Sequence, residues 1–313
     1  MGPYLTSPKK EKETENGENL KVKFGACGMQ GWRNTMEDSH IASIALDNNV
    51  QVFGVFDGHG GREVALYVKD IYIKELTKLQ SFKNKDYKTA LEESFIRIDD
   101  ILKSPQGVKD IKKYQASDDT QSSLFGRPET DNIALYTGCT ACVALITENE
   151  IYCANAGDSR CVLSNNGTAV EMSIDHKPDL STEKARIERA GGFVEENRVK
   201  GVLNLSRSLG DLEYKQDRNI GVESQMITCV PEIKVERITN NNDFLIIACD
   251  GIWDCLTSQE CISMCRDYFD STKGKGNLSS CIEQMFDKII ASDVASSGNK
   301  RQFDLKLYRW NRL

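Results

Sequence analysis

The chain has 313 residues and a formal net charge of −7, a length that suits one large domain or two small ones with a substantial core. Its acidic balance, with no block of lysine or arginine, argues against a nucleic-acid partner. The 11 cysteines follow no apolar signal segment, so we expect free thiols in a cytoplasmic, reducing compartment. No stretch reaches the length of a membrane span.

The first 20 residues are charged and poor in apolar groups, so the sequence predicts a disordered leader over residues 1–20. The run Met1–Thr6 fits the pattern for N-myristoylation at Gly2, and three lysines follow within the leader. This pattern raises the hypothesis of peripheral membrane contact. Pro3, beside the acceptor glycine, favours the alternative of a plain polar leader.

In the first half of the chain beyond the leader, the sequence predicts two strands followed by two helices. Apolar, β-prone runs predict strands over residues 40–46 and 51–56. Apolar groups at helical spacing predict helices over 62–80 and 87–103. Residues 104–137 lose this periodicity and gain Ser, Asp, Gln, Gly and Pro, which indicates a surface insertion.

The second half is rich in β-prone sequence and ends in two helices. We expect strands at 139–147, 150–155, 160–164 and 244–248, and helices at 183–190, 257–269 and 277–291. An Asn-Asn-Gly turn at 165–167 predicts a hairpin, and Thr257 begins a capping box. Groups of strands separated by pairs of helices predict a mixed α+β sandwich rather than a wound parallel sheet.

Carboxylates recur at the predicted strand ends. Glu37 and Asp38 precede a strand, Asp57 follows one, Asp158 joins two, and Asp250 ends another. A single Asp-Gly pair is usually a turn, but several such tips that converge would gather hard oxygen ligands. This chemistry favours Mg²⁺ or Mn²⁺ over zinc.

Three further residues near these acids have chemical potential. Gly58 lets another backbone segment approach closely, and His59 could move a proton. Arg33 could grip a tetrahedral oxyanion with its planar guanidinium. Its alternative role is a salt bridge to one of the neighbouring carboxylates.

These segments together resemble the type 2C family of metal-dependent protein serine/threonine phosphatases. The resemblance runs in the expected order from about residue 20 to about residue 290. The matching segments are residues 31–40, 53–61, 138–141, 155–160, 175–178, 190–194, 198–211 and 248–253. The resemblance implies a phosphatase domain over 21–298 with a flap at 179–225. Its fold would be a four-layer αββα sandwich of two antiparallel sheets flanked by helices.

The resemblance also implies a centre that holds two Mg²⁺ or Mn²⁺ ions. Glu37 and Asp57 match metal ligands of the family, with Asp57 bridging the two ions, and Gly58 would offer its carbonyl oxygen. Asp250 would complete the second metal. Asp158 matches the acid linked to a weaker third metal.

The remaining implied roles are catalytic. Arg33 would bind the substrate phosphate, Asp38 would act through metal-bound water, and His59 would protonate the leaving alkoxide. The expected substrates are phosphorylated serine and threonine residues of partner proteins. Nothing in the sequence calls for a second subunit, so we expect a monomer.

The chain departs from the family pattern at its C-terminal end. The family normally ends in Gly-x-Asp-Asn-Met/Leu-Thr and a closing strand, whereas residues 299–313 form a basic, aromatic tail. Neither Asp293 nor Asp304 stands in the context of the expected ligand, so neither is assigned. The tail is interpreted either as a frayed terminus or as a displaced strand. The missing ligand also raises an alternative function, an impaired family member that binds phosphoproteins as a regulator.

Overall fold

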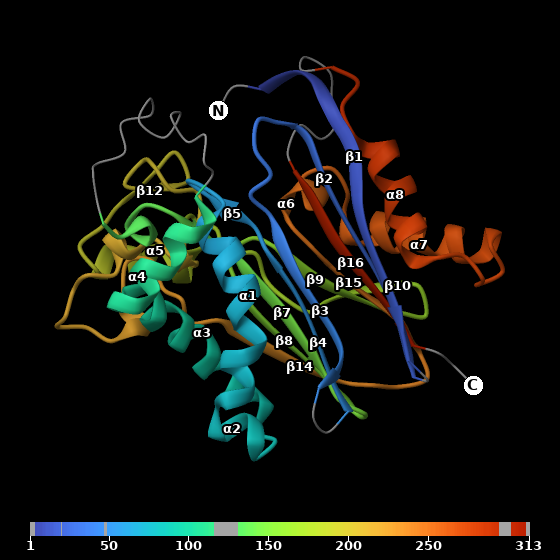
Figure 1. Ribbon diagram of the computed structural model, residues 1–313, viewed down its shortest axis with the longest axis horizontal. Coiled ribbons are helices and arrows are strands. Elements are labelled where there is room, and N and C mark those ends of the chain that lie inside the picture. The colour runs from blue at the N-terminus through green and yellow to red at the C-terminus, as the bar shows by residue number, and fades with distance from the viewer. Residues whose placement is uncertain (1–3, 20, 47–48, 116–130, 294–301, 311–313) are drawn as a thin grey trace.

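The computed structural model describes residues 4–19, 21–46, 49–115, 131–293 and 302–310. Two antiparallel sheets stack face to face, and helices cover the outer face of each (Figure 1). The prediction of an αββα sandwich of the α+β class is confirmed.

The larger sheet has six strands in the order β1-β2-β16-β15-β9-β10, all antiparallel. Its strands are β1 (Tyr4–Glu18), β2 (Val22–Arg33), β9 (Arg160–Asn165), β10 (Thr168–Glu171), β15 (Asn242–Ala248) and β16 (Phe303–Trp310). The second sheet has five strands in the order β14-β8-β7-β4-β3. They are β3 (Ser39–Leu46), β4 (Val50–Phe56), β7 (Ala141–Ile146), β8 (Glu150–Ala156) and β14 (Glu232–Arg237).

Short strands extend the structure at one end of the sandwich. They are β5 (Gly58–His59), β6 (Gly138–Cys139) and β13 (Leu209–Gly210), which form a three-stranded sheet, and the hairpin of β11 (Val194–Glu195) and β12 (Arg198–Val199). The hairpin lies in the predicted flap, and Ile187, Val199 and Tyr214 of that segment form a small separate core with Ile227.

Helices close the two outer faces. The five-stranded sheet is contacted by α1 (Glu63–Lys78) and α3 (Tyr87–Lys103), and the six-stranded sheet by α7 (Ser258–Ser271) and α8 (Leu278–Ile289). The remaining helices are α2 (Gln80–Lys83), α4 (Pro105–Ile111), α5 (Ser181–Arg189), α6 (Asp250–Trp253) and the 3-10 turns η2 (Lys112–Tyr114), η4 (Ile133–Leu135), η5 (Leu212–Tyr214) and η6 (Val222–Ser224). The predicted capping box at Thr257 is present.

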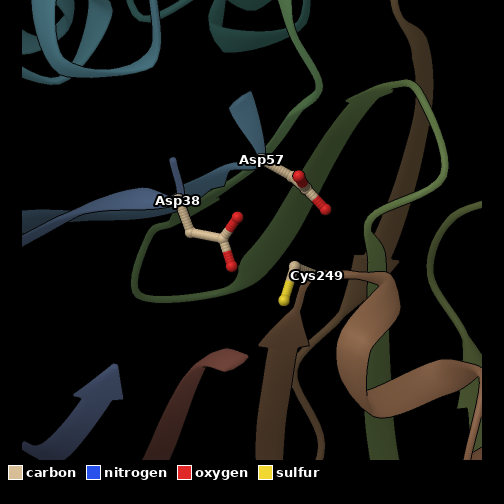
Figure 2. A group of neighbouring side chains, drawn as sticks. All are labelled: Asp38, Asp57 and Cys249. Atoms are coloured by element: carbon tan, nitrogen blue, oxygen red, sulfur yellow. The ribbon is translucent and has the colours of Figure 1, made fainter. Parts of the chain in front are cut away.

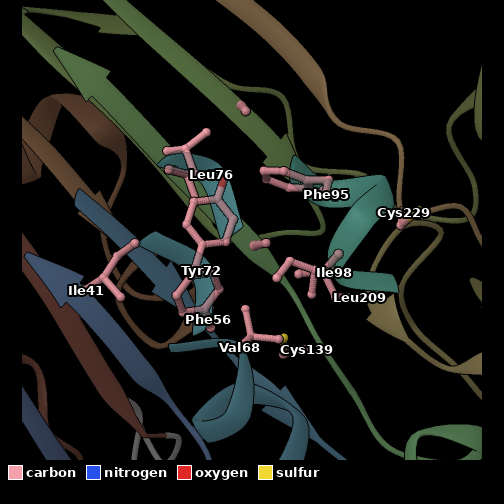
Figure 3. Packing of buried hydrophobic residues seen from close by; sticks show 14 of the residues in the cluster. Ile41, Phe56, Val68, Tyr72, Leu76, Phe95, Ile98, Cys139, Leu209 and Cys229 are labelled. Carbon is pink, nitrogen blue, oxygen red and sulfur yellow. The ribbon is translucent and has the colours of Figure 1, made fainter. Parts of the chain in front are cut away.

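Successive apolar residues of a strand pack into two different core clusters, because both faces of each sheet are covered. In β4, Val52 and Phe56 pack toward the helices, while Phe53 and Val55 pack toward the other sheet. On the helix side, Phe56 meets Tyr72, with ring centroids 5.7 Å apart, in a cluster of large side chains (Figure 3). This packing fixes strand β4, which Asp57 follows directly.

The predicted disorder of residues 1–20 is wrong for most of that segment. Residues 4–18 form β1, which pairs along β2 at the edge of the larger sheet. Lys12 bonds Asp287 at 2.6 Å, and the side chains of Asn16 and Ser279 meet at 2.7 Å. An edge strand keeps much of its surface in water and often carries charge, which is why its sequence resembled a disordered leader. Residue Gly2 lies outside the described residues.

Residues 303–310 of the C-terminal tail form a central strand, which contradicts the frayed-terminus interpretation for these residues and agrees with the interpretation as a strand. Strand β16 lies between β2 and β15. Phe303, Leu305 and Leu307 join the core beneath α7 and α8, while Asp304 and Lys306 alternate with them on the opposite face. The sheet therefore has a strand at this position, although its residues differ from the family motif.

The predicted surface insertion at 104–137 begins as ordered helix. The Ser104 hydroxyl caps α4 by accepting a hydrogen bond from the backbone N–H of Gly107 at 3.0 Å, and a proline occupies the first turn. Residues 116–130 lie outside the described part of the chain. Among the described helices, none is long and apolar enough to cross a bilayer.

We expect Leu307→Ala to reduce the free energy of unfolding by about 2–5 kcal/mol, because it removes a fully buried side chain from a packed core. Val235→Ala is the matched control: Val235 lies on a strand but is 38% exposed, so we expect a loss below about 1 kcal/mol. Urea denaturation measures both. An equal, small effect in the two variants would contradict the central position of β16.

Candidate metal centre and active site

Three side chains converge at one end of the sandwich, two of them buried and that of Asp57 partly buried. Oxygen atoms of Asp38 and Asp57 and the sulfur of Cys249 all lie within 4.8 Å of one another. Asp38 precedes β3, Asp57 follows β4, and Cys249 follows β15, so both sheets contribute. Figure 2 shows the three side chains directed toward a common space. The predicted convergence of strand ends is therefore real for these two acids.

Hydrogen bonds to neighbouring strands hold the backbone of Asp57. Its N–H donates to the hydroxyl of Thr140 at 3.1 Å, and its carbonyl accepts from the N–H of Thr140 at 2.9 Å. The Thr140 hydroxyl also meets that of Ser159 at 2.7 Å. This buried chain fixes the position of Asp57 without using its carboxylate.

The loop of Asp38 is held by β16 and by a close backbone approach. The side-chain oxygen of Gln302 accepts the N–H of Glu37 and, at 3.1 Å, the N–H of Asp38. A Cβ at Gly58 would collide with the carbonyl oxygen of Glu37, so a glycine is needed for the two ligand-bearing segments to meet. The atypical tail thus supports the site directly.

The two carboxylates lie in an environment that penalises their charge. Burial, reinforced by the charge of Asp304, raises the pKa of Asp38 to about 8. Burial and the charge of Asp38 raise the pKa of Asp57 well above its usual range. Among the described residues, neither carboxylate oxygen of Asp38 has a hydrogen-bond partner. A hard divalent cation would satisfy these oxygens, so the donor set fits Mg²⁺ or Mn²⁺.

Cys249 belongs to this cluster but is a poor ligand for such an ion. Burial and the charge of Asp38 raise the pKa of its thiol well above the usual range, and a neutral thiol is not a ligand that Mg²⁺ prefers. Its sulfur accepts the N–H of Asp304 at 3.2 Å. Cys249 therefore ties β15 to β16, a role that the sequence did not reveal.

Two other predicted acids, Asp250 and Asp158, are buried but differ in their bonding partners. Asp250 begins α6 and is buried, and its charge contributes to the raised pKa of Asp38. Asp158 is buried and is bonded by the ammonium group of Lys177. A third metal at Asp158 would therefore have to compete with this lysine.

Glu37 and Arg33 are less buried, and the structure shows neither among the three converging side chains. The Glu37 carboxylate accepts a hydrogen bond from the Thr35 hydroxyl at 2.9 Å. Arg33 ends β2, and its guanidinium forms no hydrogen bond or ion pair with the residues that the structure describes. The alternative role of Arg33, a salt bridge to a nearby carboxylate, is not observed.

His59 has a partner that sequence reasoning missed. Its Nε2 lies 2.7 Å from the Oδ2 of Asp211, far along the chain. Burial lowers the pKa of His59, but the charge of Asp211 outweighs that effect and the net shift is upward. The Gly-Asp pair at 210–211 was visible only as part of a matching segment.

Asp304 is not available as a metal ligand, in line with its not being assigned. Its two carboxylate oxygens meet Lys306 at 2.8 Å and the Nδ1 of His40 at 3.0 Å. Burial acts against its ionisation, but Lys306 and His40 more than offset burial and lower its pKa far below the usual range. Asp304 is thus a structural carboxylate within β16.

The buried Asp38 carboxylate has no hydrogen-bond partner among the described residues and lies against Asp57 at the end of a β-sandwich, an arrangement typical of a metal-dependent hydrolase. Residues 22–298 match the family described as "Protein phosphatase 2C". The chain belongs to the protein phosphatase 2C family and is a metal-dependent protein serine/threonine phosphatase. Members of this family use Mg²⁺ or Mn²⁺.

Named relatives agree with this assignment. The chain is 46% identical over 296 residues to "Probable protein phosphatase 2C 3" of Paramecium tetraurelia, which covers 94% of each chain. It is 41% identical over 318 residues to "Probable protein phosphatase 2C 21" of Arabidopsis thaliana, which covers 95% of this chain and 89% of the relative. A crystal structure of a phosphatase from Toxoplasma gondii matches the fold with a TM-score of 0.73 and 23% identity, over 96% of each chain.

We expect Asp38→Asn to stabilise the metal-free protein, and more so at higher pH. The folded chain keeps this proton up to a pKa of about 8, whereas the ordinary value is 3.8. Between these values only the folded state binds the proton, so the free energy of unfolding falls as pH rises, by at most about 1.4 kcal/mol per unit. The amide escapes this loss.

Urea denaturation in EDTA between about pH 5 and pH 7.5 measures the difference between the two proteins. Adding Mg²⁺ should stabilise the wild type more than the variant, because the variant has lost a negative ligand. A difference that stays constant across this pH range would contradict the prediction.

Proposed function

We propose that this phosphatase works through two Mg²⁺ or Mn²⁺ ions held by Asp57, Glu37, Asp250 and the carbonyl oxygen of Gly58, with Asp38 beside them. The observation that carries the proposal is the buried Asp38 carboxylate, whose oxygens have no partner among the described residues although Asp57 lies against it. Two acids placed so closely are best accounted for by cations between and around them. Such ions would activate water and neutralise charge on the phosphoryl group.

The chain's own residues supply binding and proton transfer. Arg33 would hold the substrate phosphate, a role supported by a guanidinium free of bonds to the described residues. His59 would give a proton to the serine or threonine oxygen as the ester bond breaks, because an alkoxide is a poor leaving group. The substrates are phosphoserine and phosphothreonine residues of proteins.

The proposed third metal at Asp158 is weak for a physical reason. The ammonium of Lys177 bonds the Asp158 carboxylate, and the charge of Asp158 raises the pKa of Lys177 although burial acts against it. A cation can enter only if this ammonium moves away. Two metals in the resting site are therefore the expected number.

The alternative function, an impaired regulator that binds phosphoproteins, rests on the missing ligand of the C-terminal motif. The described part of the tail supports activity instead, because Gln302 holds the loop of Glu37 and Asp38, and water can fill a vacant coordination position. Monomeric state and membrane contact through Gly2 remain predictions.

We expect the protein to hydrolyse a phosphothreonine peptide with Mn²⁺ or Mg²⁺ and to release no phosphate in EDTA. Asp57→Ala should abolish release and remove metal affinity, because a proposed metal ligand is lost. Phosphate release and isothermal titration with Mn²⁺ measure the two effects. Binding of the peptide without hydrolysis at any cation concentration would favour the regulator.

We expect His59→Gln to lower kcat on the phosphothreonine peptide by about 100-fold or more, within the range of general acid catalysis. Metal affinity should survive, because His59 holds no ion in this proposal. Steady-state kinetics and Mn²⁺ titration on the same sample separate the two effects. Unchanged turnover would remove His59 from the mechanism.

A further inference from the structure

We infer that Asp211 is the positioning residue for His59: it fixes the orientation and tautomer of the imidazole so that Nδ1 faces the leaving oxygen. This inference rests on the proposed role of His59 as the proton donor. It assigns a function to a residue that lies far from the metal-ligand candidates in sequence and that would not itself touch substrate.

The two nitrogens of His59 have different surroundings. Nε2 lies 2.7 Å from the Oδ2 of Asp211, whereas Nδ1 is buried and has no hydrogen-bond partner among the described residues. An ionised carboxylate only accepts hydrogen bonds, so the contact keeps a proton on Nε2. Nδ1 is then the nitrogen left to exchange a proton with substrate.

Asp211 is itself held rigidly. The Ser208 hydroxyl donates to its Oδ2 at 2.5 Å, and its backbone N–H donates to the carbonyl of Thr137 at 3.1 Å. The preceding residue, Gly210, donates its N–H to the buried carboxylate of Asp99 on α3 at 2.9 Å. A carboxylate with this support can orient an imidazole rather than follow it.

A glycine makes room for the pair. A Cβ at Gly138 would overlap the Oδ2 of Asp211 and lie 2.7 Å from the Nε2 of His59. Gly138 pairs with His59 on one side and with Gly210 on the other. The three-stranded sheet of β13, β6 and β5 thus brings His59 and Asp211 together across a position that carries no side chain.

The chemical step balances without a further reactant. As the water oxygen bonds to phosphorus, the water gives up one proton to solvent. The ester P–O bond breaks, and its electron pair stays with the serine or threonine oxygen. The Nδ1 proton of His59 moves to that oxygen, the Nε2 proton stays on the Asp211 contact, and solvent returns a proton to Nδ1. Asp211 remains ionised throughout, as in other acid–histidine pairs.

The test compares two substrates in the Mn²⁺-loaded enzyme. The leaving group of p-nitrophenyl phosphate is a stable anion that needs little protonation, whereas threonine alkoxide needs a proton. Asp211→Asn should lower kcat on the phosphothreonine peptide by about 10- to 100-fold and kcat on p-nitrophenyl phosphate by less than about threefold, with KM little changed. Asn suits the left-handed backbone of this position, φ 49°.

Two further variants sharpen the test. His59→Gln combined with Asp211→Asn should lose no more activity on the peptide than His59→Gln alone, because both changes remove one function. Asp243→Asn is the matched control, since the Asp243 carboxylate also accepts a serine hydroxyl, that of Ser164 at 3.1 Å, but lies in β15 of the six-stranded sheet. It should affect both substrates equally and slightly.

Equal losses on the two substrates in Asp211→Asn, or additive losses in the double variant, would overturn the inference. The ¹⁵N spectrum of the histidine rings in Mg²⁺-loaded protein gives a readout that is independent of activity. The chain has three histidines, so the ring signals that disappear in His59→Gln are those of His59. Asp211→Asn should shift the ring away from the form that keeps a proton on Nε2, with or without a second proton on Nδ1, and an unchanged ring would also overturn the inference. A wild type that shows this form yet hydrolyses neither substrate would refute the proposed function while leaving the positioning contact intact.

Discussion

The structure depends on holding Asp38 and Asp57 together in a buried place where their charges repel. Their ligand atoms lie within 4.8 Å of each other, and burial adds a large cost to ionising either one. The side-chain hydrogen bonds of the two acids do not hold them in this position. Backbone hydrogen bonds hold them instead: the N–H of Asp57 donates to the Thr140 hydroxyl, and the N–H of Asp38 donates to the side-chain oxygen of Gln302. Segments that adjoin both sheets of the sandwich therefore hold the backbones of these two acids in place.

Much of the fold was predictable because its signals are local. The helices at α1 and α3 and the strands β3 and β4 follow from apolar spacing over a few turns or residues. The same holds for the placement of Asp38 and Asp57 next to strand ends. Their meeting was a hypothesis from repeated placement, and it succeeded because neighbouring antiparallel strands bring such ends to one edge.

What sequence reasoning missed depends on contacts between distant segments. Strand β1 is charged because it is an edge, and no local pattern separates this from disorder. Strand β16 does carry a local signal, because Phe303, Leu305 and Leu307 alternate with polar residues. The absence of the family's Asp-Asn motif from the same segment obscured that signal. The contact between Asp211 and His59 had no signal at all, because only the folded three-stranded sheet brings the two segments together.

The position of β16 also makes the chain vulnerable in a particular way. Its partners β2 and β15 are otherwise not neighbours in the sheet, so its detachment would expose two unpaired edges inside the sandwich rather than shorten one margin. Open edges of this kind recruit strands from other molecules. Strand β2 is synthesised long before β16. Until β16 has been synthesised, the facing edges of β2 and β15 stay unpaired and can bind strands of other molecules. Self-association of incomplete chains is therefore a hazard that this arrangement creates.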